Sequence, residues 1–209
     1  NRGLWEFTGD GGLTQNGNGQ FVNEGTIRKS SGTGTSLWSG DLDNQGGTLA
    51  ATSGTLRLDT SSVWTEGGTL NATTGAAIVL AGYSQSCCST FRLAGRFTGS
   101  GAGTVTLGAA TTMNAWDNSG ATLDFPTGYF RLDGGTLSGT GSTGITNTGA
   151  IEISSSSQLA GRITNSGTVL VSGTGQALFT GSFDNRGLWE FTGDGGLTQN
   201  GNGQFVNEG

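Results

Sequence analysis

The chain has 209 residues, of which 42 are glycine and 32% are hydrophobic, and its formal net charge at pH 7 is −6. This composition excludes a thick conventional core, and the single proline and the lack of a three-residue glycine period exclude collagen. The acidic balance argues against a nucleic-acid partner. No apolar run approaches the roughly 20 residues that a membrane-spanning segment needs.

Residues 1–25 recur letter for letter as residues 185–209. Identity at such a long period indicates a tandem array. We therefore divide the chain into one complete repeat unit, residues 1–184, and the start of the next identical unit, residues 185–209. The junction at Phe183-Asp-Asn185-Arg186 has no linker composition, so we expect one solenoid to continue across it.

Within the unit, a short strand signature of the form Gly-x-apolar-x-apolar recurs about every 20 residues, with Gly3-Leu-Trp-Glu-Phe7 as its first copy. A second signature, apolar-x-Gly-x-apolar-x-Asn, precedes it in several places, as in Trp38-Ser-Gly-Asp-Leu42-Asp-Asn44. The full copies of the first signature begin at Gly3, Gly103, Gly128, Gly149 and Gly167, and looser copies begin at Gly25, Gly47, Gly68 and Gly120. If the starts at Gly120 and Gly128 are merged, eight coils remain per unit.

Alternation of apolar and polar residues with period two buries one face of each short strand. Together with the coil period, it predicts an all-β fold, a parallel β-helix (β-solenoid) with about eight coils of roughly 20 residues per 184-residue unit. Coils of this length with irregular corners favour the right-handed form. The residues expected to stack inward from coil to coil are Trp5, Ile27, Leu49, Leu70, Val105, Leu123, Phe130, Ile151, Val169 and Trp189.

Asparagine and glycine are expected at the corners between strands, because both tolerate positive φ. The predicted corner residues are Asn1, Gly3, Asn23, Gly25, Asn147, Gly149, Asn165, Gly167, Asn185 and Gly187. Lys29 contradicts the pattern, since it stands at an inward position. Either its strand ends early or its side chain reaches out to solvent.

Three segments and one short motif resemble large repetitive bacterial surface proteins: Phe21–Thr35, Asn147–Ile153, Asn165–Val171, and Gly-Gly-Thr-Leu at residues 46–49, 67–70 and 134–137. These proteins are the filamentous-haemagglutinin and autotransporter-like adhesins and fibres. The resemblance implies secretion and an extracellular, cell-surface location. It is specific for the fold and leaves the function open, because this group includes adhesins, matrix fibres and secreted passengers.

Cys87 and Cys88 fall in an interval about 15 residues longer than a normal coil, so we expect an excursion from the solenoid around residues 76–98. In a secreted protein the two residues are candidates for a vicinal disulfide or for cross-links between chains, and the alternative is a pair of incidental thiols. A metal site is not expected, because the sequence has no histidine and no other cysteine.

The sequence also argues against an enzyme. Without histidine and with one lysine, it provides no nucleophilic triad, so we expect no catalytic residue and no cofactor. Coil stacking is expected to bring Glu6 near Arg28 and Arg131 near Glu152, as solvated charge pairs of small value.

The leading hypothesis is a structural repeat protein that forms an extracellular fibre or stalk. Its partners would be further copies of the unit, in the same chain or end to end. The alternative is an adhesin that contacts a surface or a polysaccharide through the 76–98 excursion or through exposed aromatic residues, with Trp64 and Trp116 as candidates. A second alternative is a carbohydrate-active β-helix enzyme, which would need clustered acids in a groove.

Overall fold

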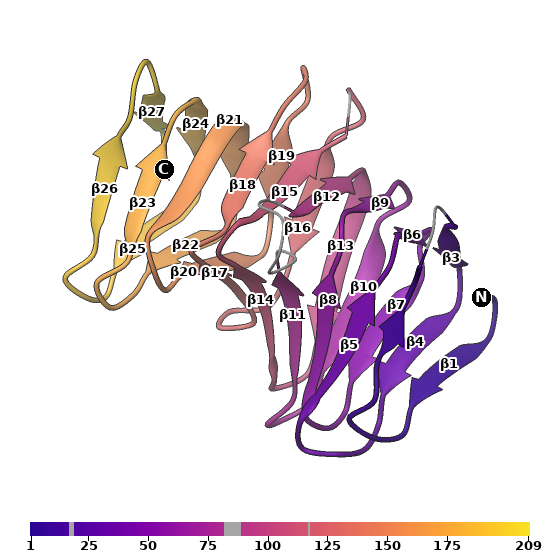
Figure 1. The fold of residues 1–209 in the computed structure, drawn as a ribbon. Helices are drawn as coiled ribbons and strands as arrows, with labels where there is room; N and C mark the ends of the chain where they lie inside the picture. Colours follow the sequence, from indigo (N-terminus) through magenta and orange to yellow (C-terminus); the bar gives the residue numbers. More distant parts are fainter. Residues whose placement is uncertain (17–18, 82–88, 117) are drawn as a thin grey trace.

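The computed structural model describes residues 1–16, 19–81, 89–116 and 118–209. These residues form 27 β-strands and no helix, and the strands wind into a solenoid with three sheets around a thin core (Figure 1). Every strand pairs in parallel with its counterpart in the neighbouring coil, from the indigo N-terminal end to the yellow C-terminal end. The predicted all-β parallel β-solenoid is therefore confirmed.

We call the three sheets A, B and C in the order in which the chain visits them. Sheet A contains β1 (Leu4–Phe7), β4 (Thr26–Lys29), β7 (Thr48–Ala51), β10 (Gly68–Ala72), β13 (Gly95–Ser100), β16 (Ala121–Asp124), β19 (Ile145–Asn147), the second half of β21 (Ser157–Asn165), β24 (Ser182–Asn185) and β27 (Gln204–Asn207). Sheet B contains β2 (Leu13–Thr14), β5 (Thr35–Ser39), β8 (Thr55–Asp59), β11 (Ala77–Ala81), β14 (Thr104–Gly108), β17 (Phe130–Asp133), β20 (Ala150–Ile153), β22 (Thr168–Val171) and β25 (Leu188–Phe191). Sheet C contains β3 (Phe21–Asn23), β6 (Leu42–Asn44), β9 (Ser62–Trp64), β12 (Ser89–Leu93), β15 (Thr111–Ala115), β18 (Thr136–Gly139), the first half of β21, β23 (Gln176–Phe179) and β26 (Gly196–Gln199).

The period-two alternation places one face of each strand in the core. In β8, for example, Leu56 and Leu58 are buried, whereas Arg57 between them faces outward. Parallel register then stacks each inward residue on its counterpart one coil away, so that Ile78 lies between Leu56 and Val105. Full burial of one such side chain contributes about 1.5–3 kcal/mol, and the stack supplies a continuous core that no single coil could form.

The predicted core residues occupy two stacks, where one was expected. Ile27, Leu49, Leu70 and Leu123 belong to sheet A, whereas Val105, Phe130, Ile151 and Val169 belong to sheet B; all are at most 2% exposed. Trp5 is 40% exposed and Trp189 is half-buried, because their coils have a neighbouring coil on one side only.

The break between these stacks comes from the number of faces per unit. Each coil has three faces, and each face is one strand in sheet A, B or C. From β1 to β24 the described chain forms 24 strands, and β21 contributes to two sheets, which makes 25 faces. The unit therefore winds through eight and one-third turns, in agreement with the prediction of about eight coils. Merging the starts at Gly120 and Gly128 gave the correct number of coils there, because the strands after them lie in sheets A and B and are successive faces of one coil. The additional face lies in the long interval from Gly68 to Gly103, which holds one full coil and one further face.

Tyr129 closes the region where the chain adds that face. It is 2% exposed, and its ring lies over Gly99, where an added Cβ would come within 2.5 Å of Tyr129 Cε1. Its hydroxyl accepts a hydrogen bond from Ala72 N and lies 2.7 Å from the Leu70 carbonyl oxygen. Burial raises the pKa of this phenol above its usual value. The Tyr129 side chain thus supplies a hydrogen-bond partner for the backbone at the end of β10.

Substitution of Tyr129 by phenylalanine is expected to lower the free energy of unfolding by about 1–3 kcal/mol, because the Ala72 amide loses a buried partner. Urea unfolding followed by circular dichroism would measure the loss. A variant as stable as the unchanged chain would show that water replaces the hydroxyl.

The corner glycines are required for a different reason from the one expected. Gly25, Gly149, Gly167 and Gly187 do not have positive φ, and Ala110 is the only non-glycine residue with positive φ in the described part of the chain. An added Cβ at Gly167 would instead come within 2.0 Å of the Gly149 carbonyl oxygen. These glycines are needed because successive coils approach too closely for any side chain.

Lys29 is also placed differently from both expectations. It is the last residue of β4, and its side chain is fully buried in the solenoid. Its Nζ donates to Asp10 Oδ1 at 2.8 Å, to the carbonyl oxygens of Ser31 and Gly9, and to Ser36 Oγ at 3.3 Å. The buried charge is tolerated because oxygen atoms surround it and one of them is a carboxylate.

Candidate functional site: the joint between repeat units

The candidate functional site is the joint between the two copies of the repeated sequence, where the second copy begins at Asn185. The identical segments 1–25 and 185–209 form the first and last coils of the solenoid (Figure 1). Most of the predicted corner residues lie in or beside these two coils. Cys87 and Cys88 lie outside the described residues.

The corner asparagines form hydrogen-bonded ladders. Near the N-terminus, Asn1 Nδ2 donates to Asn23 Oδ1 at 2.8 Å, and Asn23 Nδ2 donates to Asn44 Oδ1 at 2.7 Å. Asn23 and Asn44 are almost completely buried. Each amide in turn satisfies the next, as buried polar groups require. The asparagines are therefore placed at the corners by side-chain pairing along the axis, not by backbone conformation.

A second ladder crosses the joint. Asn147 donates to Asn165, Asn165 to Asn185, and Asn185 to Asn207, at 2.7, 2.7 and 2.6 Å. Asn185 and Asn207 are the sequence equivalents of Asn1 and Asn23. The ladder thus begins in one copy of the unit and continues in the next without a change in geometry.

The backbone is equally continuous at the joint. Strands β25, β26 and β27 pair in parallel with β22, β23 and β24, four residues in each pair. The turn amides also follow the ladder, since Arg186 N and Gly187 N both donate to the Asn165 carbonyl oxygen. The turn after Asn23, near the other end, repeats this pattern: Glu24 N and Gly25 N both donate to the Asn1 carbonyl oxygen.

The two copies of the repeated segment show how its coil packs against the preceding coil and against the following coil. At the C-terminal end, Phe205 stacks on Phe183 of the preceding coil at 5.4 Å between ring centroids. At the N-terminal end, its equivalent Phe21 packs edge-on against Trp38 of the following coil at 4.8 Å. Within the coil itself, Trp5 and Phe21 are 5.6 Å apart and Trp189 and Phe205 are 5.3 Å apart. The segment keeps its internal packing and has a complementary surface on each side.

Ion pairs on the outer surface connect residues of neighbouring coils. Arg28 and Glu6 pair at 2.7 Å and Arg131 and Glu152 at 3.1 Å, which confirms both predicted charge pairs. Hydrogen bonds from Ser30 and Arg28 hold the pKa of Glu6 below its usual value. Ion pairs with this much solvent exposure add little stability. Each one nevertheless joins residues that are register partners in adjacent coils.

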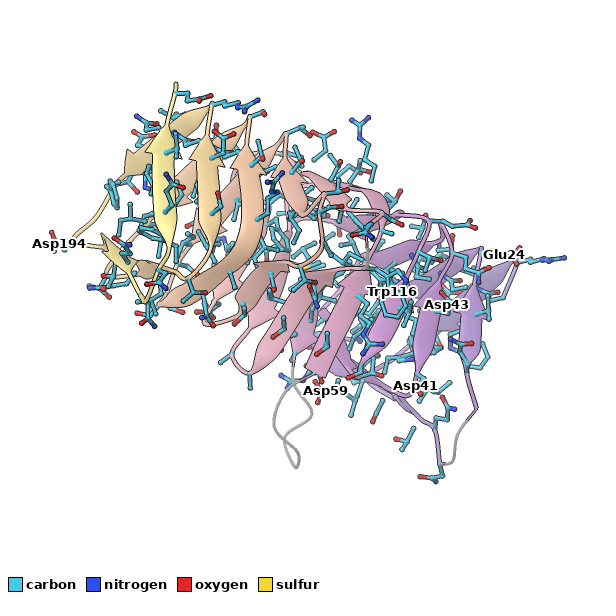
Figure 2. All side chains as sticks on the ribbon, turned by 90° about the horizontal axis from the view of Figure 1, so that it is seen from above. Glu24, Asp41, Asp43, Asp59, Trp116 and Asp194 are labelled. Carbon is cyan, nitrogen blue, oxygen red and sulfur yellow. The ribbon has the colours of Figure 1, made fainter. Side chains whose placement is uncertain are left out.

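Asp10 has the clearest electrostatic role in the first coil. A hydrogen bond from Lys29 lowers the pKa of its carboxyl group, and the Lys29 charge and the Gly34 amide act in the same direction. Its sequence equivalent, Asp194, lies exposed at the opposite end of the solenoid (Figure 2). Lys29 is the single lysine of the printed sequence and belongs to the coil next to Asp10, so it does not contact Asp194.

We expect Asp10→Asn to reduce the loss of stability on acidification. Because the folded-state pKa of Asp10 is lowered, its contribution is present above the unfolded-state value, about 3.9, and disappears as the pH falls through the folded-state value. Urea midpoints measured between pH 5 and pH 2 should therefore fall less steeply in this variant. Asp194→Asn is the matched control, and an equal change in both variants would contradict the assignment to the Lys29 contact.

At the C-terminal end the joint surface is open. Leu188 and Phe191 are 53% and 46% exposed, and a hollow of about 290 Å³ is lined by Trp189, Leu197 and Phe205. The N-terminal edge exposes Leu4 at 52% as well as Trp5. Open strands and apolar side chains at both ends are surfaces on which a further coil can add.

A second feature is a groove of about 280 Å³ on the outer face of sheet C. Asp41, Ser61, Thr90 and Arg92 line it, and the Arg92 guanidinium lies 4.8 Å from the centre of the Trp116 ring. Figure 2 shows Asp41, Asp43 and Trp116 on the half of the solenoid nearer the N-terminus. Trp116 is half-buried, whereas Trp64, the other aromatic candidate, is fully buried.

No family model, curated protein or solved structure matches this chain. Among the described residues, no group of three or more acidic, cysteine or histidine side chains is arranged to hold a metal ion. Nor do the described residues include a helix long and apolar enough to cross a membrane.

Proposed function

We propose that this chain is a module of a structural fibre or stalk on a bacterial cell surface, built from copies of the 184-residue unit. The observation that supports this most strongly is the joint. The duplicated residues add a complete layer to the solenoid through all three sheets, with the ladder and the core uninterrupted. Each added unit would therefore lengthen the structure without a hinge.

The chemistry of such a module is mechanical. Backbone hydrogen bonds between coils run along the solenoid axis in three parallel sheets, and the asparagine ladders add side-chain bonds in the same direction. Tension along the axis is then shared by many bonds per layer. The resemblance to repetitive bacterial surface proteins supports secretion and an extracellular location.

Electron microscopy of the native material, beside a denaturing gel run with and without reductant, tests this proposal. We expect long fibres of constant width and a band far above the 21.0 kDa of this chain. A band unaffected by reductant would indicate one tandem-repeat chain, and small bands released by reductant would identify Cys87 and Cys88 as linkers between chains. Isolated compact particles of about 21 kDa would contradict the fibre.

A second candidate function is adhesion through the groove on sheet C. Opposed charges at Asp41 and Arg92, hydroxyl groups at Ser61 and Thr90, and the adjacent Trp116 ring together suit a polysaccharide, which combines hydrogen-bonding hydroxyls with apolar ring faces. This function is compatible with the fibre, because one groove would recur in every unit.

Binding of the chain to an array of surface polysaccharides would test adhesion. Binding that is lost in Arg92→Ala and Trp116→Ala, and kept in Arg57→Ala on sheet B, would support the groove. Equal binding by all three variants would place any contact elsewhere.

A further inference from the structure

The identical segments at the two ends of the chain lie on different faces of the solenoid. In the first copy, Leu4–Phe7 forms β1 in sheet A and pairs with β4. In the second copy, the same letters, Leu188–Phe191, form β25 in sheet B and pair with β22. Phe21–Asn23 in sheet C and Phe205–Asn207 in sheet A show the same displacement. All the duplicated strands are shifted by one face in the same sense.

This shift follows from the 25 faces that the unit occupies, because 25 is not a multiple of three. The relation must hold at every joint between such units, since the sequences and the contacts at each joint are the same. We infer that successive 184-residue units are related by about one third of a turn around the axis. The inference rests on the proposed tandem arrangement of units.

The ladders give an independent view of the same relation. Near the N-terminus the asparagine ladder runs at the corner where sheet C meets sheet A, and near the C-terminus it runs where sheet A meets sheet B. Asn185 and Asn207 correspond to Asn1 and Asn23, and Asn23 is bonded to Asn44. The ladder that starts at Asn147 in one unit would therefore cross the joint and end at the equivalent of Asn44 in the next unit. The next ladder then stands at the next corner. Three consecutive ladders would reinforce all three corners in turn.

The shift also determines the direction in which a given surface groove of each unit points. The groove lined by Asp41 and Arg92 lies on sheet C in the first unit. It would lie on sheet A in the second unit and on sheet B in the third. A fibre built this way presents the same surface to a partner on every side, and it returns to the starting orientation after three units. At each joint, the last coil of one unit packs against the first coil of a second copy of the same sequence.

The structure of a two-unit chain, in which residues 1–184 precede the present 209 residues, tests the inference. We expect the operation that superposes the first unit on the second to combine an advance of about 40 Å, from roughly 4.8 Å per coil, with a rotation of one face. A second unit that superposes without rotation would overturn it. The outcome is independent of whether native material forms fibres, because the rotation is measured within one chain.

The 209-residue chain offers a second test by disulfide trapping, with Cys87 and Cys88 replaced by serine. Thr168 and Leu188 are register partners in sheet B, so Thr168→Cys with Leu188→Cys should cross-link on mild oxidation. The matched control is Leu4→Cys with Thr26→Cys, the same leucine in the first copy. If the control pair cross-links and the Thr168→Cys, Leu188→Cys pair does not, the second copy lies on another face and the inference is overturned.

Discussion

Asn165→Ala is expected to lower the free energy of unfolding by about 2–4 kcal/mol, because it leaves buried polar groups without partners on both sides. Asn165 is fully buried, accepts a hydrogen bond from Asn147 Nδ2 and donates to Asn185 Oδ1, each at 2.7 Å. Its Nδ2 also reaches the Leu188 carbonyl oxygen at 3.1 Å, across the joint. Urea unfolding of the variant would measure the loss.

Two further variants separate the ladder from general packing. Thr164→Ala changes the outward neighbour on the same strand and should cost no more than about 0.5 kcal/mol. Asn165→Asp keeps the shape, removes the donor and buries a carboxylate, whose pKa burial raises. Its destabilisation relative to the unchanged chain should therefore grow as the pH rises from about 4 to 7. Equal effects of the Asn165→Ala and Thr164→Ala variants would contradict the importance of the ladder.

Gly187→Ala is expected to cost about 1–3 kcal/mol, because an added Cβ would lie 2.1 Å from the Gly167 carbonyl oxygen and would force two coils apart. The clash is with backbone, so no side-chain movement relieves it. The measurement is again the urea midpoint, with electron microscopy or small-angle scattering to detect fraying of the last coil.

The duplication supplies an unusually close control for this prediction. Gly3 has the same sequence neighbours as Gly187, yet an added Cβ at Gly3 meets no described atom within 4 Å. Gly3→Ala should therefore leave stability nearly unchanged in this chain. In a two-unit chain the same substitution at the start of the second unit should be as harmful as Gly187→Ala. If the two substitutions cost the same in the 209-residue chain, coil contact is not the reason for glycine at this position.

The fold was predictable because its strands carry local signals. Gly-x-apolar-x-apolar segments and period-two alternation depend on neighbours in sequence, and they placed residues such as Leu49, Val105 and Val169 in the core. The Glu6–Arg28 and Arg131–Glu152 pairs were also predictable, since both partners occupy equivalent outward positions one coil apart.

The displacement of faces was harder to predict. The spacing of signature starts gives the coil length but does not say which of three sheets a strand joins. The starts at Gly120 and Gly128 were therefore not recognised as strands of two different sheets. That interval was itself the signal, because eight residues suffice for one strand and one turn in this chain. The long interval after Gly68 was the complementary signal of an added face.

The roles of Lys29 and of the asparagines were missed for a different reason. Both depend on side chains of neighbouring coils, which are distant in sequence. Asn23 reaches Asn44 across 21 residues, and Lys29 reaches Asp10 across 19. Asparagine at a recurring coil position was visible in the letters. A preference for positive φ accounted for it equally well until the backbone angles were known.

The most direct measurement of the central claim is the length of chains that contain one, two and three copies of the unit, by electron microscopy of purified material. A continuous solenoid predicts that each added copy lengthens the particle by about 40 Å, from eight and one-third turns of roughly 4.8 Å, at constant width and without a bend at the joints. Particles that become wider, or that form separate beads joined by flexible links, would contradict a continuous solenoid through the duplicated segment.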